Sequence, residues 1–197
     1  MVVPPNKRFT IETWLELGLA VLGDAGVCGL SIERICAFAG KTRGSFYHHF
    51  ADHNEFVVAV LEHWQKSSTA SVIAAVVNVS DSHAQRKALA RQVAELSSAS
   101  ENAIRGWAGT DERARRVVQK VDQSRLDFLE QGIVALAAQA GIQLTGPEAQ
   151  RLALLDYGLF IGIHALRPGE TADYYLKLNE LSENMLKAWM DKRVHPD

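Results

Sequence analysis

Hydrophobic residues along this chain recur mostly three or four positions apart, which is the spacing of one helix face rather than of a strand. Glycine, proline and capping residues mark the breaks between these apolar stripes. Asp52 and Thr110 are expected to cap the helices that follow them. The expected helices span about residues 11–24, 31–38, 43–49, 53–78, 82–96, 101–108, 111–140, 146–167 and 170–191. No clear strand-like alternation interrupts them, so the sequence predicts an all-α fold of about nine helices.

The stretch 31–50 has the pattern of two short helices joined by a tight turn. Ser31 and Thr42 precede the two helices as capping residues, because a hydroxyl can accept an unpaired backbone N–H of a first turn. Gly40 supplies the left-handed backbone that often ends a helix, and Phe46 points the second helix inward. This pattern predicts a helix-turn-helix, whose second helix enters the DNA major groove.

The composition is that of an ordinary globular protein. The 197 residues give room for one large domain or two small ones, and 47% are hydrophobic and 22% charged. No run approaches the roughly 18 apolar residues that a membrane helix needs, and the first residues lack the apolar core of a signal peptide. We therefore expect a cytoplasmic protein with no membrane partner.

Cysteine and histidine usage gives no strong sign of redox or metal chemistry. Cys28 and Cys36 are interpreted as small core residues in a reducing cytoplasm, and a disulfide or redox switch is the alternative. The histidines form no cluster with carboxylates or thiols at metal-ligand spacing. We expect neither a metal nor a cofactor.

The net charge of −2 is not in itself typical of a nucleic-acid-binding protein. Residues 1–65 carry five basic and seven acidic side chains, so this part is also acidic. A local basic patch is nevertheless available, because Lys41 and Arg43 lie in a stretch without acids between Glu33 and Asp52. Any affinity for DNA must come from this patch.

The order of these residues resembles the N-terminal DNA-binding domain of TetR-family transcriptional regulators. The matching residues are Gly26, Ser31, Ile32, Ile35, Ala39, Gly40, Thr42, Gly44, Ser45, Phe46, Tyr47, His49, Phe50 and Phe56. The resemblance implies a DNA-binding domain over residues 1–52, a connecting helix over about 53–78, and a helical ligand-binding and dimerisation domain over 53–197. Residues 104–108 and 121–126 also resemble the ligand-binding lobe of one branch of these regulators.

The resemblance also implies a set of DNA-binding residues. They are Ser31, Lys41, Thr42, Arg43, Gly44, Ser45, Tyr47, His48 and His53. Arg43 either reads a guanine or contacts a phosphate, Tyr47 either donates to a phosphate or packs, and His48 either contacts DNA or faces solvent. Two positions depart from the family pattern, since His53 stands where a lysine is usual and Lys41 where an apolar residue is usual. Because imidazole changes its charge near neutral pH, His53 would make DNA binding depend on pH.

The second domain offers two further sets of candidate residues. Candidates for a ligand pocket are Trp107, Phe128, Tyr157, Phe160 and His164, for which ordinary core packing is the alternative. Candidates for a dimer interface on the last two helices are Leu152, Leu155, Leu159, Ile163, Leu181, Met185 and Trp189. Two such helices from each subunit can form a four-helix bundle, or these faces pack on the preceding helices of the same chain.

The expected function is that of a homodimeric transcriptional repressor. Its partners would be a double-stranded DNA operator, a second copy of the chain and an unknown small-molecule inducer that releases it from DNA. A first alternative is an accessory protein that keeps the fold but has lost DNA binding, which the acidic balance of residues 1–65 favours. A second is a helical enzyme, but no glycine-rich phosphate loop, paired catalytic carboxylates or Ser/His/Asp set is recognisable.

Overall fold

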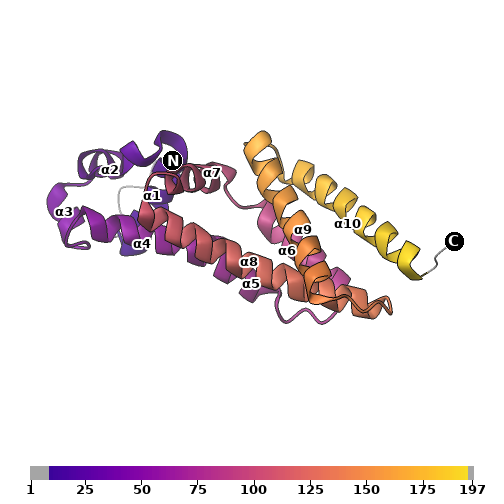
Figure 1. The fold of residues 1–197 in the computed structure, drawn as a ribbon. Coiled ribbons are helices and arrows are strands. Elements are labelled where there is room, and N and C mark those ends of the chain that lie inside the picture. The colour runs from indigo at the N-terminus through magenta and orange to yellow at the C-terminus, as the bar shows by residue number, and fades with distance from the viewer. Residues whose placement is uncertain (1–8, 195–197) are drawn as a thin grey trace. The chain divides into compact units, whose positions relative to one another are not determined.

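The computed structural model describes residues 9–194, and all the regular elements in that range are helical (Figure 1). The elements are α1 (Ile11–Ala25), η1 (Val27–Leu30), α2 (Ile32–Ala39), α3 (Arg43–Tyr47), α4 (His53–Gln65), η2 (Lys66–Ala70), α5 (Ser71–Val76), α6 (Ser82–Ala94), α7 (Ser98–Ala108), α8 (Glu112–Gln139), α9 (Gly146–Leu166) and α10 (Ala172–Val194). Because α4, η2 and α5 follow one another without a break, they form one continuous helix. Counted in this way, the described residues form nine α-helices and a short 3-10 turn, which confirms the predicted all-α fold.

Most helix boundaries follow from the capping residues that the sequence carries. The side chains of Thr10, Ser31, Thr42 and Asp52 each accept a backbone N–H from the third residue along, over 2.8 to 3.4 Å. Gly40 has a φ of 61°, so its left-handed backbone ends α2 as predicted. Thr145 and Glu148 form a capping box at the start of α9.

Two predicted boundaries were wrong because a neighbouring residue provides the cap. Asp111, not Thr110, caps α8, since its carboxylate accepts the backbone N–H groups of Arg113 and Ala114. Ser97 accepts the N–H of Ser100, so α7 begins at Ser98 rather than near residue 101.

The sequence also gave no sign of two irregular turns. Residues 27–30 form the short 3-10 helix η1 between α1 and α2. Residues 66–70 form η2, a π-helical turn inside the long helix that continues from α4 into α5. Such turns arise where an extra residue is inserted into a helix, and they are frequent at functional sites.

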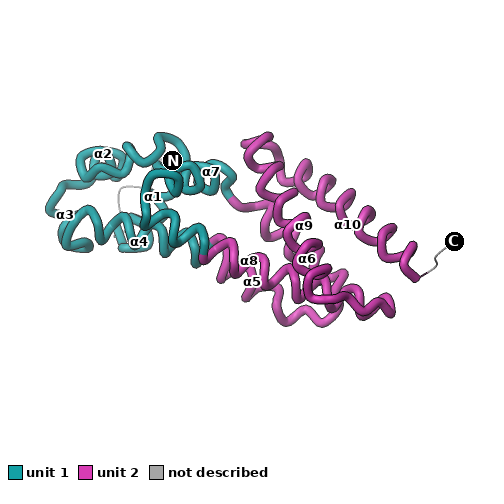
Figure 2. Tube along the Cα trace, in the orientation of Figure 1, with its two compact units in different colours: residues 1–67, 97–119 teal, residues 68–96, 120–197 magenta. Residues whose placement is uncertain are grey.

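The described chain divides into two compact units (Figure 2). Unit 1 comprises the described residues up to Ser67 together with Ser97–Gln119, and unit 2 comprises Ser68–Leu96 together with the described residues from Lys120 onward. This division differs from the boundary expected after residue 52, because α4 and α7 both pack on α1. The assignment of separate DNA-binding and ligand-binding roles to the two parts remains a prediction.

Unit 1 is built around a cluster of buried aromatic rings. Phe46, the inward residue of α3, has its ring centroid 5.6 Å from that of Trp14, 5.2 Å from Phe50 and 5.3 Å from Phe56. All four side chains are at most 3% exposed. Such burial is worth several kcal/mol for each ring, which is why a helix as short as α3 can hold its position.

Unit 2 is assembled from α5, α6, α9, α10 and most of α8. Its α6 packs against both α5 and α10. A small hydrophobic cluster of Leu136, Ala137, Ile142 and Met190 joins the end of α8 to α10. None of the helices in the described range is long and apolar enough to cross a membrane.

Candidate functional site

The first candidate site is the outer face of α3 in unit 1. The buried Phe46 fixes this helix, so the residues around it are turned toward solvent. Lys41, Arg43, Tyr47 and His48 are all exposed, and Tyr47 is 51% exposed. The short helix and the residues on either side of it therefore expose two cations, a phenol and an imidazole.

Four more of the predicted DNA-binding residues are helix-capping or small residues near this surface. The hydroxyls of Ser31 and Thr42 accept backbone N–H groups at the starts of α2 and α3, which leaves their own O–H groups to donate elsewhere. Ser45 is half-buried, and its backbone N–H is the one that donates to the Thr42 hydroxyl. At Gly44, an added Cβ would meet nothing closer than Thr42 Oγ1 at 3.7 Å, so packing within the protein does not require a glycine here. The absence of a side chain leaves the backbone of α3 exposed at this position.

Both cations of this surface have contacts within unit 1. Arg43 forms an ion pair with Glu33 on α2, and both side chains are more than half exposed. The ammonium of Lys41 lies 5.5 Å from the centre of the Phe9 ring, within cation–π range. An exposed ion pair of this kind is worth at most about 1 kcal/mol, so a phosphate can replace Glu33 at Arg43.

His53, in the first turn of α4, contacts the backbone at the edge of the same unit. Its Nε2 lies 2.9 Å from the carbonyl oxygen of Leu30. Since a carbonyl only accepts, Nε2 carries the proton in this contact, and a neutral ring then offers only a lone pair at Nδ1. His53 therefore needs to be protonated before it can donate to a phosphate as predicted.

The first turn of α4 is tied to the start of α8. Arg113 donates from Nη1 to Asn54 Oδ1 over 2.5 Å, and its guanidinium also pairs with Asp111 over 2.6 Å. The hydrogen bonds from the Arg113 side chain, with the backbone N–H groups of Ala114 and Arg113, lower the pKa of Asp111 from 3.8 to about 2. Asn54 follows His53, so this network holds the end of α4 that carries His53, one of the residues that the resemblance assigns to DNA binding.

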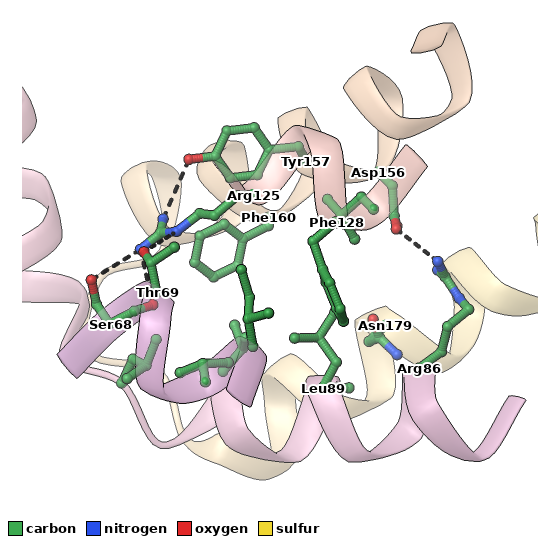
Figure 3. Close-up of a pocket in the computed structure, with 16 residues that line it drawn as sticks. Ser68, Thr69, Arg86, Leu89, Arg125, Phe128, Asp156, Tyr157, Phe160 and Asn179 are labelled. Carbon is green, nitrogen blue, oxygen red and sulfur yellow. Dashed lines mark hydrogen bonds and ion pairs between the residues drawn. The ribbon is translucent and has the colours of Figure 1, made fainter. Parts of the chain in front are cut away.

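The second candidate site is a cavity of about 110 Å³ within unit 2. Most of its wall is apolar, as in typical small-molecule sites. The lining residues are Ser68, Thr69, Val72, Ile73, Arg86, Leu89, Ala90, Val93, Leu96, Arg125, Phe128, Leu129, Asp156, Tyr157, Phe160 and Asn179. Figure 3 shows a polar group at each end of the cavity, around Arg125 and around Arg86, with Phe128, Phe160 and Leu89 between them.

At one end of the cavity, Arg125 contacts the π-helical turn η2. Its Nε donates to Thr69 Oγ1 over 3.0 Å, and Nη2 donates to the carbonyl oxygen and hydroxyl of Ser68 over 3.3 and 3.2 Å. Nη1 donates to the Tyr157 hydroxyl over 3.3 Å, and that hydroxyl donates to Asp122 over 2.6 Å. The guanidinium also lies over the rings of Tyr157 and Phe160, at 5.9 and 5.6 Å from their centroids.

At the other end, the buried Arg86 is shared by two carboxylates. Its Nη1 lies 3.0 Å from Asp156 on α9, and its Nε lies 3.8 Å from Glu183 on α10. Arg86 is 8% exposed, and its Nε makes no hydrogen bond with the described residues. Asn179 donates to the same Glu183 over 3.4 Å. This end therefore carries two negative charges and one positive charge.

The structure brings together three of the five residues predicted for a ligand pocket. Phe128, Tyr157 and Phe160 line the cavity. Trp107 does not, because it is buried in unit 1, where the guanidinium of Arg113 covers its ring. His164 does not either, since its ring is buried behind Phe160 and stacks on Tyr175 at 4.4 Å.

Sequence reasoning missed the charged residues of the cavity, although the helix pattern contained a signal. Arg125 stands four residues after Val121 and four before Leu129, on the buried stripe of α8. Arg86 occupies the same kind of position in α6, three residues before Leu89. A charge on an apolar stripe needs buried partners, and it is therefore a sign of a polar site inside the fold.

The third candidate surface is an apolar face of α9 and α10. Of the residues predicted for a dimer interface, those exposed in the single chain are Leu155, Leu159, Leu181, Met185 and Trp189. Leu152 and Ile163 are partly buried. The exposed fractions of Leu155 and Met185 are 71% and 66%, so these side chains do not pack on other helices of their own chain.

Cysteine and metal chemistry have no structural support in the described residues. Cys28 is exposed, Cys36 is buried, and both are free thiols. Burial raises the pKa of the Cys36 thiol, which keeps it protonated and unreactive. No group of three or more His, Cys, Asp or Glu side chains in residues 9–194 is placed to hold a metal ion.

Comparisons with known proteins identify the fold. No family model matches the sequence, and no curated protein is significantly similar to it. Among solved structures, a protein from Pseudomonas aeruginosa PAO1 assigned as a transcriptional regulator is 20% identical, with a TM-score of 0.72 over 97% of this chain and 95% of that one. A TetR transcription regulator from Haloarcula marismortui is 16% identical, with a TM-score of 0.69 over 89% and 96%.

A third solved structure was determined with a bound small molecule. It is a protein from Saccharomonospora viridis assigned as a transcriptional regulator and solved in complex with choline. It is 13% identical, with a TM-score of 0.70 over 94% of this chain and 96% of that one. At these identities the likeness concerns the fold, and the chain has the fold of TetR-family regulators.

Proposed function

We propose that this chain is a homodimeric transcriptional regulator of the TetR type, a repressor that binds operator DNA and leaves it when a small molecule enters unit 2. The observation that carries the proposal is the exposure of Arg43 and Tyr47 on α3, and of Lys41 and His48 on either side of it, while Phe46 anchors the helix in the core. Solved structures with the same fold are regulators of transcription, which supports this assignment.

The chemistry of the α3 face suits a major groove. A guanidinium such as that of Arg43 can donate to O6 and N7 of guanine together, while a phenol and an ammonium can donate to phosphates. Because the net charge is low, only a small area of the surface can make these contacts. We therefore expect binding that depends on the operator sequence and is weak on unrelated DNA.

A second copy of the chain is the partner proposed for the apolar face of α9 and α10. Two copies would bury Leu155, Leu159 and Met185 in a four-helix bundle, which explains why such large side chains are exposed in one chain. A dimer would also place two α3 helices on one DNA duplex, where successive major grooves are about 34–36 Å apart.

The cavity of unit 2 is the proposed inducer site. It is apolar with a few polar groups, and a solved neighbour of the same fold holds a small molecule. A ligand that binds better to one arrangement of the dimer shifts the population toward it. Repression is released if that arrangement no longer matches two successive major grooves.

An accessory protein without DNA binding is the second candidate. The ion pair between Glu33 and Arg43 favours it, because it neutralises the cation best placed to read a base. The two proposals are separated by a gel-shift assay with the DNA upstream of the chain's own gene. A regulator gives salt-dependent binding to this DNA, and an accessory protein binds no genomic fragment even at low salt.

A further inference from the structure

We propose that the cavity of unit 2 takes a small apolar monocarboxylate, whose acid group binds Arg125 in place of the hydroxyls of Ser68 and Thr69. This inference rests on the proposed function only in treating the cavity as a ligand site. It names the chemical class of the ligand, the residue that recognises it, and the segment of the chain that responds.

Arg125 has four contacts with neutral acceptors, which a carboxylate can replace. Its guanidinium donates to the hydroxyls of Ser68, Thr69 and Tyr157 and to one carbonyl, over 3.0 to 3.3 Å. Hydrogen bonds from a guanidinium to a carboxylate are shorter and about twice as strong as those to neutral acceptors. An acid that enters the cavity would therefore compete well with the hydroxyls, and its chain would lie against the apolar wall.

The opposite end of the cavity holds two carboxylates, whereas Tyr157 contacts one, Asp122, at the Arg125 end, and this difference directs the acid toward Arg125. There Asp156 and Glu183 surround the single guanidinium of Arg86, at 3.0 and 3.8 Å. A third carboxylate at this end would add to an existing excess of negative charge in a buried place. A dicarboxylate of the same length should for this reason bind less well than a monocarboxylate.

The aromatic side chains argue against a cationic ligand. The rings of Tyr157 and Phe160 are stacked, with centroids 6.1 Å apart, and the guanidinium of Arg125 already lies over both. A bound ammonium would need these ring faces and would meet the charge of Arg125. The cavity therefore discriminates by charge against amines.

The acid would also release the π-helical turn η2. Ser68 and Thr69 belong to this turn, which lies where the continuous helix α4–η2–α5 passes from unit 1 to unit 2. The contacts of Arg125 with the Ser68 carbonyl and hydroxyl hold the turn in its irregular form. Once Arg125 binds a ligand, the turn loses these contacts, and the hydrogen bonding of residues 66–70 changes.

Calorimetry with four six-carbon probes tests the proposal on the full chain. The probes are hexanoate, hexanamide, hexylamine and adipate, which share a length and differ in their charged groups. We expect hexanoate to bind most tightly and Arg125→Gln to weaken it by about tenfold or more, the usual loss for a charge-assisted hydrogen bond. Arg91→Gln removes an exposed arginine of α6 and should leave binding unchanged.

Folding of the variants is checked separately. Arg125→Lys keeps the charge and should retain part of the preference for hexanoate, and thermal melting reports whether each variant is folded. Hydrogen exchange supplies a second readout, because hexanoate should speed exchange of the amides of residues 66–70 in the wild type. Slower exchange there, or no change on saturation, would contradict the release of the turn.

Several outcomes would overturn the proposal. Hexylamine or hexanamide binding as tightly as hexanoate would do so, as would an unchanged preference in a folded Arg125→Gln variant. Failure of all four probes to bind at 10 mM, about the weakest affinity expected for ligands of this size, would also reject the class. DNA binding is measured in a separate gel-shift assay, so these failures leave the proposed DNA-binding function standing.

Discussion

Arg43, the first residue of α3, is ion-paired with Glu33 of α2 in the free protein. The residue best placed to read a base thus has an internal acidic partner on the neighbouring helix. A phosphate or a guanine has to displace this partner, and the displacement costs part of the binding free energy.

Glu33→Gln should therefore raise the affinity for operator DNA. The gain is at most about fivefold, because an exposed ion pair is worth roughly 0.2–1 kcal/mol. Fluorescence anisotropy with a labelled operator at low salt measures it. Glu62→Gln removes an exposed acid of α4 with no contact to Arg43 and serves as the matched control. An equal gain in both variants would show that overall charge, not this pair, is responsible.

DNA binding should strengthen as the pH falls from 7.5 to 6. His53 donates from Nε2 to the Leu30 carbonyl, so only its protonated form can also donate from Nδ1 to a phosphate. We expect a gain of up to about fivefold in the wild type, the value of one exposed charge contact. His53→Gln should weaken the pH dependence, whereas His83→Gln, at an exposed histidine of α6 outside the α3 face, should keep it. A pH profile that is flat in the wild type, or unchanged in His53→Gln, would reject this role.

Leu155→Glu should convert the protein to a monomer. Leu155 is 71% exposed on α9, and a charge there would be buried without a partner in the proposed four-helix bundle. Analytical ultracentrifugation gives the mass of the wild type and the variant. Val77→Glu changes another exposed apolar residue of unit 2, directly after α5 and outside the predicted interface set, and should remain dimeric. A monomeric wild type would contradict the proposed interface.

The cap at the start of α8 should make stability depend on pH in the acid range. The hydrogen bonds from Arg113 lower the pKa of Asp111 from 3.8 to about 2, so the carboxylate stabilises the fold above pH 4 and loses this effect as the pH falls toward 2. Asp111→Ala should cost about 1 kcal/mol in free energy of unfolding at neutral pH, a typical value for a lost cap.

Denaturant titrations from pH 6 to pH 2.5 check this prediction. The difference between the wild type and Asp111→Ala should shrink below pH 4, because the wild-type carboxylate becomes protonated there. Thr110→Ala removes a hydroxyl from the adjacent residue but no charge, so its cost should not change with pH. A constant difference for Asp111→Ala would mean that the residue acts through packing alone.

The helices of this fold were predictable because capping residues and glycines at their ends mark where most of them begin and stop. Ser31, Thr42 and Asp52 cap the helices that they precede, and Gly40 ends α2, as predicted. The error at Thr110 arose because two adjacent residues can both cap, and the error near residue 101 arose because the cap, Ser97, is one of several serines before that residue. A π-helical turn such as η2 has no such local sign, because its contacts come from Arg125 on a distant helix.

The candidate sites were predictable to different degrees for the same reason. The DNA face of α3 lies within about twenty residues of sequence, so its exposed residues could be identified from the helix pattern. The cavity of unit 2 combines five helices, and spacing along one helix could place Phe128, Tyr157 and Phe160 but not their partners. Arg86 and Arg125 could be assigned to the cavity only from the structure, which shows the acids and hydroxyls that they contact.

Binding of the full chain to the DNA upstream of its own gene, compared with the Arg43→Ala and Tyr47→Phe variants, tests the central claim most directly. Anisotropy titrations between 50 and 200 mM salt, a range chosen because phosphate contacts weaken steeply across it, give both the affinity and its salt slope. The account predicts salt-dependent binding by the wild type, a loss of about tenfold or more in Arg43→Ala and a smaller loss in Tyr47→Phe. Binding by both variants that equals the wild type, or no binding by the wild type to any genomic fragment at the lowest salt, would contradict it.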